Sequence, residues 1–382
     1  MMHSGELAGR TKIVYPRKRM VAAEDRSAGS RALLVPAAWI YRLVSTGQKK
    51  LKHKPVGTYG AVAIISIGNI EVGGGGKTPF CIHLLEALTR EGYRPVYASR
   101  GFKSESERLG AVTVVLPKEP ASVLSIEAQI RFVRRDAALL DRVVGDEGAM
   151  VAWRLPQVPL VFSSCKTKAI KAAISLFDPT HIILDDAFQS WGLYRDLDVV
   201  LLDARKPFGN GRMLPAGTLR EEPSALSRAD WIGFNDLPDR EDLPALEESI
   251  DKATSCKKPV FGILRHACLQ SPEGDPCDPI DGPIASLSSI ARPDRFDQSL
   301  ERCGCDVRLS IRYPDHHGYG NDDAQIVQAL LREHKVAGVV TTEKDWVKLR
   351  DLESVSSTIS IARLELEIAG GNIVDRIKKP QA

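Results

Sequence analysis

The amino-acid sequence predicts an α/β fold, with a parallel-sheet domain, a second, smaller α/β domain and an N-terminal interfacial helix. Three observations predict it. At 382 residues the chain is too long for one small core. A hydrophobic content of 43% and a charged content of 26% are typical of a globular chain that folds in water. From Tyr59 onward, short apolar strands alternate with helical patterns, which is typical of a mostly parallel sheet covered on both faces.

Five segments are expected along the chain. Residues 1–31 are polar, mixed in charge and without periodicity, and predict a disordered extension. An amphiphilic helix is expected over 32–54, the first α/β domain over 55–205 and the second over 206–366. Residues 367–382 form a C-terminal tail.

The first element, residues 32–44, is apolar but too short to cross a membrane. It has about 13 residues, whereas a spanning helix needs about 20. Trp39 and Tyr41 lie within it, and a basic cluster follows, made of Lys49, Lys50, Lys52, His53 and Lys54. This pattern favours a helix in the headgroup layer of an anionic membrane. The alternative is a helix packed on the protein's own core.

The strands expected in the first domain are Val62–Ile67, Pro95–Ala98, Val158–Phe162, His181–Leu184 and Asp198–Leu202. Those expected in the second are Val260–Leu264, Ile284–Leu287, Asp306–Ile311 and Val336–Thr341. Pro79 opens a helix directly after the first strand. Apolar residues at helical spacing between Leu116 and Val143 predict a further, surface helix.

Charge and cysteine content exclude some classes of function. A net charge of +3 is too weak to indicate a nucleic-acid partner. The seven cysteines contain no metal-type pair of pairs, and their odd number fits a reducing compartment. Cys303 and Cys305 are interpreted as ordinary thiols with no assigned role.

The strongest motif is the strand, glycine run and helix between Val62 and Leu88. Consecutive glycines let backbone N–H groups turn toward one phosphate, and the following helix start adds its positive dipole end. Lys77 can reach the β and γ phosphates, and the Thr78 hydroxyl can coordinate Mg2+. The sequence therefore predicts a P-loop kinase-like domain that binds ATP and Mg2+. The residues of this loop are Gly73, Gly74, Gly75, Gly76, Lys77 and Thr78.

The loop departs from the usual Walker A pattern at one position. Glu71 stands where the first glycine is expected, and Gly68 lies three residues earlier. The alternative to a nucleotide site is a chance glycine turn.

Asp185 and Asp186 follow the apolar run that begins at His181. A neighbouring strand would bring these carboxylates beside the Mg2+ of the glycine loop, as in a Walker B motif. Acidic residues also end strands simply as polar caps.

Two further clusters are polar and turn-like: Gly145-Asp146-Glu147 and Pro314-Asp315-His316-His317. A carboxylate hydrogen-bonded to a histidine can accept a proton from an attacking hydroxyl. Turns and helix caps also use these residue types, and the distance along the chain leaves open whether the clusters meet.

Taken together, these motifs resemble the tetraacyldisaccharide 4'-kinase (lipid A 4'-kinase) family over about residues 32–366. The resemblance rests on many short motifs in the family's order. They are Ser66–Ile70, Val72–Pro79, Ser99–Phe102, Gly145–Glu147, Leu184–Gln189, Arg195–Asp198, Leu214–Gly217, Leu219–Glu221, Pro314–His317 and Thr341–Asp345.

The resemblance implies ATP- and Mg2+-dependent phosphorylation of the 4'-hydroxyl of a tetraacylated glucosamine disaccharide 1-phosphate. It implies a peripheral location on the cytoplasmic face of the bacterial inner membrane, and ATP bound between two α/β domains. It also implies that Asp146 is the catalytic carboxylate, paired with His316, and that Lys77 acts with them. Asp185 and Asp186 would serve the metal and phosphate geometry, with Thr78 as a further metal ligand.

The sequence departs from the family pattern in three motifs. Gly148, Ala187 and Ser190 replace the usual proline, glycine and histidine, and Cys165-Lys166 replaces Asp-Arg. Lysine offers a point charge where arginine offers a planar fork, so these departures bear on recognition of the acceptor.

Two other functions compete with this interpretation. A regulatory P-loop ATPase that switches partner binding would share the glycine loop and the aspartates, but would not need a partner for Asp146. A catalytically weakened lipid-binding relative is the other, and intact Lys77, Asp146 and His316 argue against it.

Overall fold

The structure is a computed structural model that describes residues 3–7, 10–15, 58–73, 75–117, 130–134, 140–350, 352, 359–371 and 373–378. The helix expected over 32–54, residues 16–31 and Gly74 lie outside this part. Among the helices described, none is both long enough and apolar enough to span a bilayer.

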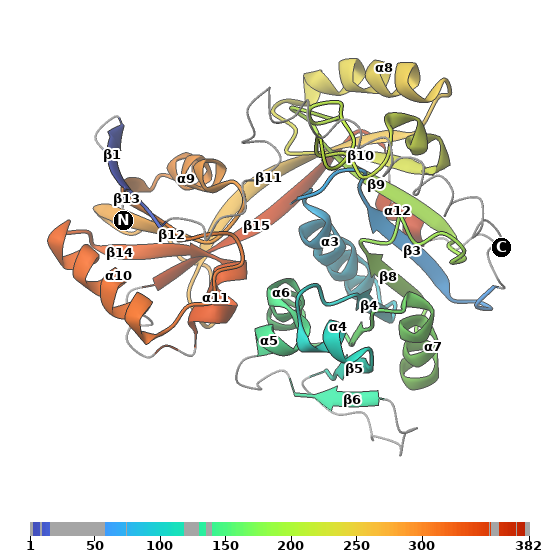
Figure 1. The fold of residues 1–382 in the computed structure, drawn as a ribbon, viewed down its shortest axis with the longest axis horizontal. Helices are drawn as coiled ribbons and strands as arrows, with labels where there is room; N and C mark the ends of the chain where they lie inside the picture. Colours follow the sequence, from blue (N-terminus) through green and yellow to red (C-terminus); the bar gives the residue numbers. More distant parts are fainter. Residues whose placement is uncertain are drawn as a thin grey trace. The chain divides into compact units, whose positions relative to one another are not determined.

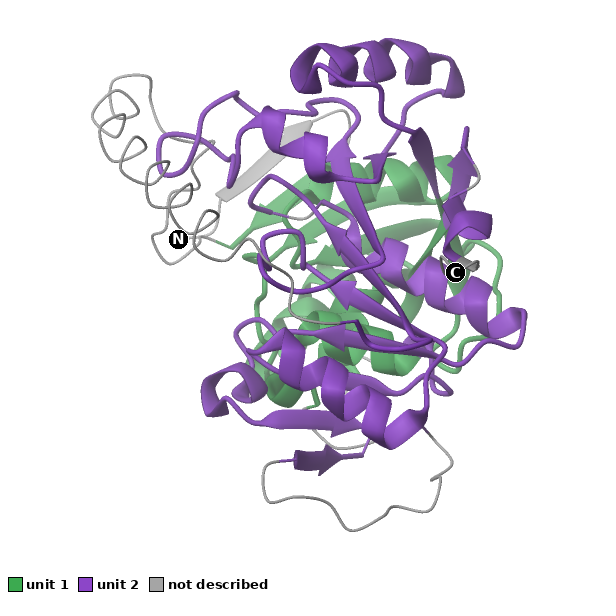
Figure 2. Ribbon diagram, turned by 90° about the vertical axis from the view of Figure 1, so that its right-hand side faces the viewer, with its two compact units in different colours: residues 1–20, 136–153, 266–365 green, residues 21–135, 154–265, 366–382 purple. Residues whose placement is uncertain are grey.

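Two compact units make up the chain, and both are assembled from separate stretches of sequence (Figure 2). Unit 1 comprises residues 1–20, 136–153 and 266–365, and unit 2 comprises 21–135, 154–265 and 366–382. This division differs from the single boundary expected near residue 205. Strands β11 (Val260–Gln270) and β15 (Ile359–Ala369) each begin in one unit and end in the other, and hydrophobic patterning does not reveal such crossings.

The sheet of unit 2 confirms the predicted α/β class (Figure 1). Its strand order is β11-β10-β9-β3-β8-β4-β7-β5-β6, and all its recorded pairings are parallel except β5 with β7. Every residue of β3, β8 and β9 is buried, as expected for parallel strands covered on both faces. The bounds are β3 (Ala63–Gly68), β4 (Pro95–Ser99), β5 (Val112–Val115), β6 (Ile130–Val133), β7 (Leu160–Phe162), β8 (His181–Asp185), β9 (Leu197–Asp203) and β10 (Trp231–Asn235).

Two helices cover the strands that carry the phosphate-binding motif. Helix α3 (Lys77–Arg90) packs on β4 and β8, and α7 (Lys166–Phe177) packs on β4 and β7. The buried residues of α3 recur at helical spacing, which is why this segment forms the predicted helix. The other helices of unit 2 in the described part of the chain are α4 (Glu105–Leu109), η2 (Pro223–Arg228), η3 (Arg240–Asp242), α8 (Leu243–Thr254) and α12 (Ile373–Lys378).

The helix predicted between Leu116 and Val143 is wrong for Ile130–Val133, which is strand β6. It pairs in parallel with β5, and Ile130 and Phe132 pack against the core cluster beneath. Ile130 and Val133 suit a helix and a strand equally, and an available sheet edge decides between them.

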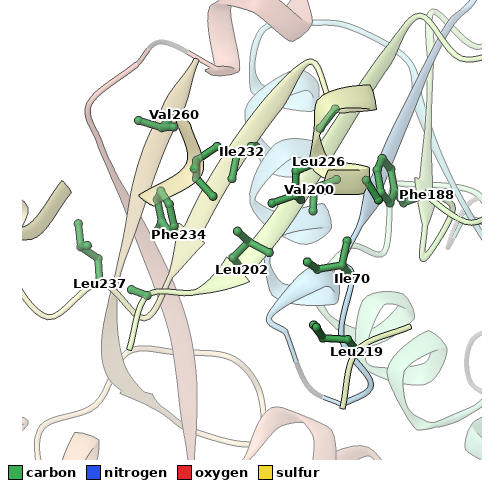
Figure 3. Close-up of a cluster of buried hydrophobic side chains, with 14 of the residues drawn as sticks. Ile70, Phe188, Val200, Leu202, Leu219, Leu226, Ile232, Phe234, Leu237 and Val260 are labelled. Carbon is green, nitrogen blue, oxygen red and sulfur yellow. The ribbon is translucent and has the colours of Figure 1, made fainter. Parts of the chain in front are cut away.

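A hydrophobic cluster in unit 2 anchors both ends of the candidate phosphate site (Figure 3). It brings Ile70, just before the glycine loop, together with Phe188, just after the two aspartates. Val200 and Leu202 of β9 and Leu219 pack in the same cluster. A Cβ on Gly68 would lie only 2.4 Å from that of Phe188, so glycine is required for this close approach.

The sheet of unit 1 has the order β1-β2-β13-β12-β14, followed by the first residues of β15. All pairs are parallel except β1 with β2. Its strands are β1 (His3–Leu7), β2 (Arg10–Val14), β12 (Pro283–Ser288), β13 (Asp306–Arg312) and β14 (Gly338–Thr342). Its helices, among the residues that the structure describes, are α5 (Leu140–Val144), α6 (Asp146–Arg154, whose last residue belongs to unit 2), α9 (Pro293–Arg302), α10 (Asn321–Glu333) and α11 (Glu343–Leu349).

The disordered extension expected over residues 1–31 is corrected where the structure describes it. Residues 3–7 and 10–14 form strands, and Ile13 is buried in the unit 1 core with Leu309 and Ile311 of β13. Ile13 is the only buried residue of β2, and one buried residue in five gave too weak a signal in the sequence.

Candidate active site

The glycine loop of unit 2 leads from β3 into the N-terminus of α3, as predicted. Gly76 precedes the helix with φ +75°, and a Cβ there would lie 2.4 Å from Arg265 Nη2 and 2.6 Å from Asn235 Oδ1. Only glycine fits both constraints. No side chain caps this helix end and its first turn has no acidic residue, so its N–H groups suit an anion.

Asp185 lies at the end of β8, directly beside the first turn of α3. Its Oδ2 atom accepts hydrogen bonds from Thr78 Oγ1 and from the Tyr97 hydroxyl, each at 2.8 Å. All three residues are buried, and among the described residues no group hydrogen-bonds to Asp185 Oδ1. A buried, unpaired carboxylate oxygen beside a threonine hydroxyl suits a divalent cation.

Asp186 faces two cationic side chains. Lys77 Nζ lies 3.5 Å from Oδ1, and Arg220 Nη1 donates to both carboxylate oxygens at 2.9 and 3.0 Å. Burial alone would raise the pKa of Asp186, but the charges of Lys77 and Arg220 lower it to about 2. The carboxylate is therefore ionised at neutral pH.

Lys166, at the start of α7, donates a hydrogen bond to the Asp185 carbonyl oxygen at 2.5 Å. Burial lowers the pKa of its ammonium group, while Asp186 and Asp185 oppose that shift. Lys166 thus places a positive charge beside both aspartates.

The departure at Glu71 has a structural explanation. Thr218 Oγ1 donates to Glu71 Oε1 at 2.5 Å, and the backbone pairs Val72 N to Thr218 O at 2.8 Å. Arg220 N donates to Ile70 O at 2.7 Å. These contacts fasten the glycine loop to the segment that carries Arg220, so Glu71 performs a task that glycine could not.

The predicted metal ligands fit Mg2+ when phosphate oxygens complete the site. Within the described ranges, no three His, Cys, Asp or Glu side chains are grouped so that they alone could hold a metal ion. Mg2+ commonly takes one or two carboxylates, with water and phosphate oxygens as its other ligands. Thr78 Oγ1 and the unpaired Oδ1 of Asp185 supply protein oxygens of that kind.

In unit 1 the structure brings the two turn-like clusters together. His316 Nδ1 lies 2.8 Å from Asp146 Oδ2, although the residues are 170 positions apart. Asp146 is the first residue of α6. Lys344 Nζ lies 3.4 Å from Asp146 Oδ2 and 3.3 Å from Asp315 Oδ1. The side chains of Asp146 and His316 are 11% and 26% exposed, so the pair can still be reached from solvent.

The surroundings keep this carboxylate charged. Burial acts to raise the pKa of Asp146, but the hydrogen bond to His316 and the charge of Lys344 hold it well below its usual range. Burial also acts to lower the pKa of Lys344, and Asp146 and Asp315 outweigh it and raise the pKa. Asp146 and Lys344 therefore form an ion pair at neutral pH.

The loop that carries His316 is held in an unusual conformation. His316 has φ +64°, a region that residues other than glycine seldom adopt. Its amide donates to Ser289 O at 3.3 Å, and Lys348 Nζ donates to His317 O at 2.9 Å. Such a conformation persists where the surroundings over-determine it.

The predicted site residues thus form two groups, and each lies within one unit. Unit 2 gathers Lys77, Thr78, Asp185 and Asp186, and unit 1 pairs Asp146 with His316. Gly74 lies outside the described residues.

Three residues at these sites were given no role from the sequence: Tyr97, Arg220 and Lys344. Arg220 and Lys344 belong to short motifs already recognised, Leu219–Glu221 and Thr341–Asp345, which was the available signal. Tyr97 lies inside a predicted strand and carried no signal of its own.

Comparisons with known proteins agree on one family. A family model described as tetraacyldisaccharide-1-P 4'-kinase matches residues 30–379. A tetraacyldisaccharide 4'-kinase from Syntrophus aciditrophicus is 32% identical over 317 residues, 80% of each chain. One from Anaeromyxobacter dehalogenans (strain 2CP-C) is 35% identical over 326 residues, 81% of this chain and 78% of the relative. One from Bdellovibrio bacteriovorus is 30% identical over 347 residues, 89% and 96%.

A solved structure is similar in fold. The crystal structure of an "apo" form of LpxK from Aquifex aeolicus, in complex with ATP, superimposes with a TM-score of 0.65 at 23% identity. The match covers 91% of this chain and 98% of that one.

Proposed function

Because this chain belongs to the tetraacyldisaccharide 4'-kinase family, we propose that it transfers the γ-phosphoryl group of ATP to a lipid acceptor. The acceptor is the 4'-hydroxyl of a tetraacylated glucosamine disaccharide 1-phosphate. The observation that carries this proposal beyond ATP binding is the 2.8 Å contact between Asp146 and His316. A regulatory P-loop ATPase would not need it.

The residues of unit 2 would hold the nucleotide. The glycine loop and the start of α3 bind the phosphates through backbone N–H groups. Lys77 and Arg220 lie at Asp186 and supply positive charge where negative charge accumulates on the transferred group. Thr78, Asp185 and Asp186 would hold Mg2+, which supplies charge neutralisation on the phosphate oxygens.

Asp146 would accept the proton of the acceptor hydroxyl. As the new bond forms between the 4'-oxygen and the γ-phosphorus, the bond to the bridging oxygen breaks and ADP leaves. The hydroxyl proton passes to the Asp146 carboxylate, which its low pKa keeps ionised at neutral pH.

The acceptor's lipid character accounts for the N-terminal segment 32–54. We place this segment on an anionic membrane surface, peripheral to the cytoplasmic face of the bacterial inner membrane. Its support is the sequence pattern of Trp39, Tyr41 and the following lysines.

One assay tests the proposal. Purified protein is incubated in detergent with γ-labelled ATP, Mg2+ and the tetraacylated disaccharide 1-phosphate, and the label on the lipid is measured. An acceptor already phosphorylated at the 4' position is the control and should remain unlabelled. Hydrolysis of ATP without transfer to the lipid would favour the regulatory ATPase instead.

A further inference from the structure

Strand β2 lies outside the part of the chain that matches the family. The family model begins at residue 30, whereas β2 comprises Arg10–Val14. It pairs in parallel with β13, from Thr11 with Leu309 to Val14 with Arg312. Tyr15 N extends the ladder with a 2.9 Å hydrogen bond to Arg312 O.

Side-chain contacts also hold β2 on unit 1, in addition to the backbone hydrogen bonds with β13. Ile13 is 6% exposed in the core cluster. Arg10 Nη1 lies 3.2 Å from Asp297, which is 1% exposed, and Arg10 Nε donates to Val307 O at 3.1 Å. Lys12 Nζ pairs with Asp294 at 3.0 Å. Strand β2 is therefore an integral part of the fold of unit 1.

An aromatic stack leads from β2 to the loop of the candidate histidine. The rings of Tyr15 and Tyr313 are parallel within 7°, with centroids 4.4 Å apart. Tyr313 in turn stacks on His317 at 4.5 Å, and Tyr319 contacts both rings edge-on. His317 Nε2 also lies 3.1 Å from Asp323 Oδ2.

The stack includes Tyr313 and His317, the two residues that flank the segment Pro314-Asp315-His316. His316 lies between Tyr313 and His317 and has φ +64°. Its own restraints include the amide hydrogen bond to Ser289 O and the contact with Asp146. The rings of Tyr313 and His317 thus fix the neighbouring backbone and reduce the freedom of the imidazole.

We propose that β2, acting through Tyr15, is a positioning element that holds His316 against Asp146. The expected fall in kcat rests on the proposed function. The expected loosening of residues 313–317 does not. Tyr15 touches neither catalytic residue, and it acts through Tyr313 and His317.

The test compares Tyr15→Ala with Tyr15→Phe. The phenylalanine variant keeps the ring that stacks on Tyr313 and removes only the hydroxyl. Stacked aromatic pairs contribute enough to predict a fall in kcat of about 3- to 10-fold for Tyr15→Ala. Tyr15→Phe should stay within about twofold, and the KM for ATP should not change in either variant.

A double variant distinguishes positioning of His316 by Tyr15 from a general loss of activity that does not involve His316. In a His316→Ala background, Tyr15→Ala should have almost no further effect on kcat, since the residue through which it acts is gone. Losses that multiply, or equal kcat in Tyr15→Ala and the unchanged protein, would overturn the proposal.

Amide hydrogen exchange gives a readout that needs no activity. Tyr15→Ala should speed exchange over residues 313–317, while Tyr15→Phe should not, and exchange in β14 should remain slow in both. Faster exchange throughout unit 1 would indicate a structural role and refute positioning. If the unchanged protein fails to phosphorylate the lipid, the proposed function fails, and the exchange of residues 313–317 still decides the role of Tyr15.

Discussion

The hydroxyl of Tyr97 donates a 2.8 Å hydrogen bond to Asp185 Oδ2, the oxygen that also accepts from Thr78. Tyr97 is fully buried, and its ring packs edge-on against Phe162. The hydrogen bond therefore fixes the carboxylate so that its other oxygen remains available to a cation.

Tyr97→Phe is expected to lower kcat by about 3- to 10-fold, because the carboxylate loses one of its two hydrogen bonds. The concentration of Mg2+ that gives half-maximal activity should rise as well. Tyr194→Phe is a matched control, since Tyr194 donates at 3.0 Å to Asp196, which lies outside the glycine loop. Equal Mg2+ dependence in both variants would exclude a role for Tyr97 in holding the cation site.

Lys77→Ala and Thr78→Ala are each expected to lower phosphoryl transfer about 100-fold or more. Positioned charges and Mg2+ stabilise the transferring group almost entirely in this kind of reaction. Initial rates with the labelled lipid measure the effect, and Lys171→Ala, at an exposed position of α7, controls for loss of a lysine. Turnover close to that of the unchanged protein would remove the phosphate-site assignment.

Asp146→Asn is expected to lower kcat about 100-fold or more while changing the affinity for ATP far less. His316→Ala should cost less, about 10-fold, because the histidine orients the carboxylate and does not replace it. The double variant should resemble Asp146→Asn alone, since the pair acts as a unit. A defect equal to the product of the two single defects would show that the residues work independently.

Lys344→Met is expected to reduce the free energy of unfolding by about 1–2 kcal/mol at pH 7, since the ion pair of Lys344 with Asp146 is lost. The depressed pKa of Asp146 stabilises the fold above the ordinary pKa of an aspartate, about 4, and this stabilisation is lost as pH falls through the folded value. The folded pKa of Asp146 is higher in the variant, so the difference between the two proteins should be full at pH 5–7 and shrink only when pH falls below the folded pKa of the variant.

Urea unfolding at several pH values measures this difference, and Lys344→Arg, which keeps the charge, is the control. Equal free energies of unfolding for the unchanged protein and Lys344→Met at pH 7 would show that Lys344 does not stabilise the fold through the ionised Asp146.

Reversing the charge of the N-terminal lysines is expected to release the protein from anionic vesicles. Glutamates at Lys49, Lys50, Lys52 and Lys54 remove an attraction of about 1 kcal/mol per lysine. Sedimentation with phosphatidylserine vesicles measures the binding. The control carries glutamates at four exposed lysines of unit 2, Lys168, Lys171, Lys252 and Lys257. Equal loss in both proteins would point to net charge and not to the segment.

The sequence was sufficient where function depends on contiguous residues. The glycine run, Lys77 and Thr78 are adjacent, and the apolar strand and helix beside them have unambiguous periods. Local pattern therefore predicted the strand, the loop and the helix together, and β3, β8 and β9 appear where expected.

The sequence was insufficient where a site depends on contacts between residues that are far apart in the chain. The contact of Asp146 with His316 spans 170 positions of the sequence, and the hydrogen-bonded ion pair of Arg220 with Asp186 spans 34. Composition gives no measure of such distances. β2 was missed because its stability comes from β13, and the unit division was missed because the strand pattern of β11 continues across the boundary.

The interleaving of the two units has a consequence for synthesis on the ribosome. Arg10 bonds to Val307, 297 positions later, so β2 emerges long before its partner strand exists. Unit 2 also depends on a distant contact, because His181 Nε2 lies 3.1 Å from the Ile377 carbonyl oxygen, 196 positions later. Contacts of such long sequence separation form slowly. In the nascent chain, β2 must therefore stay unpaired with β13, and His181 must lack its contact with α12, until those distant segments have been made.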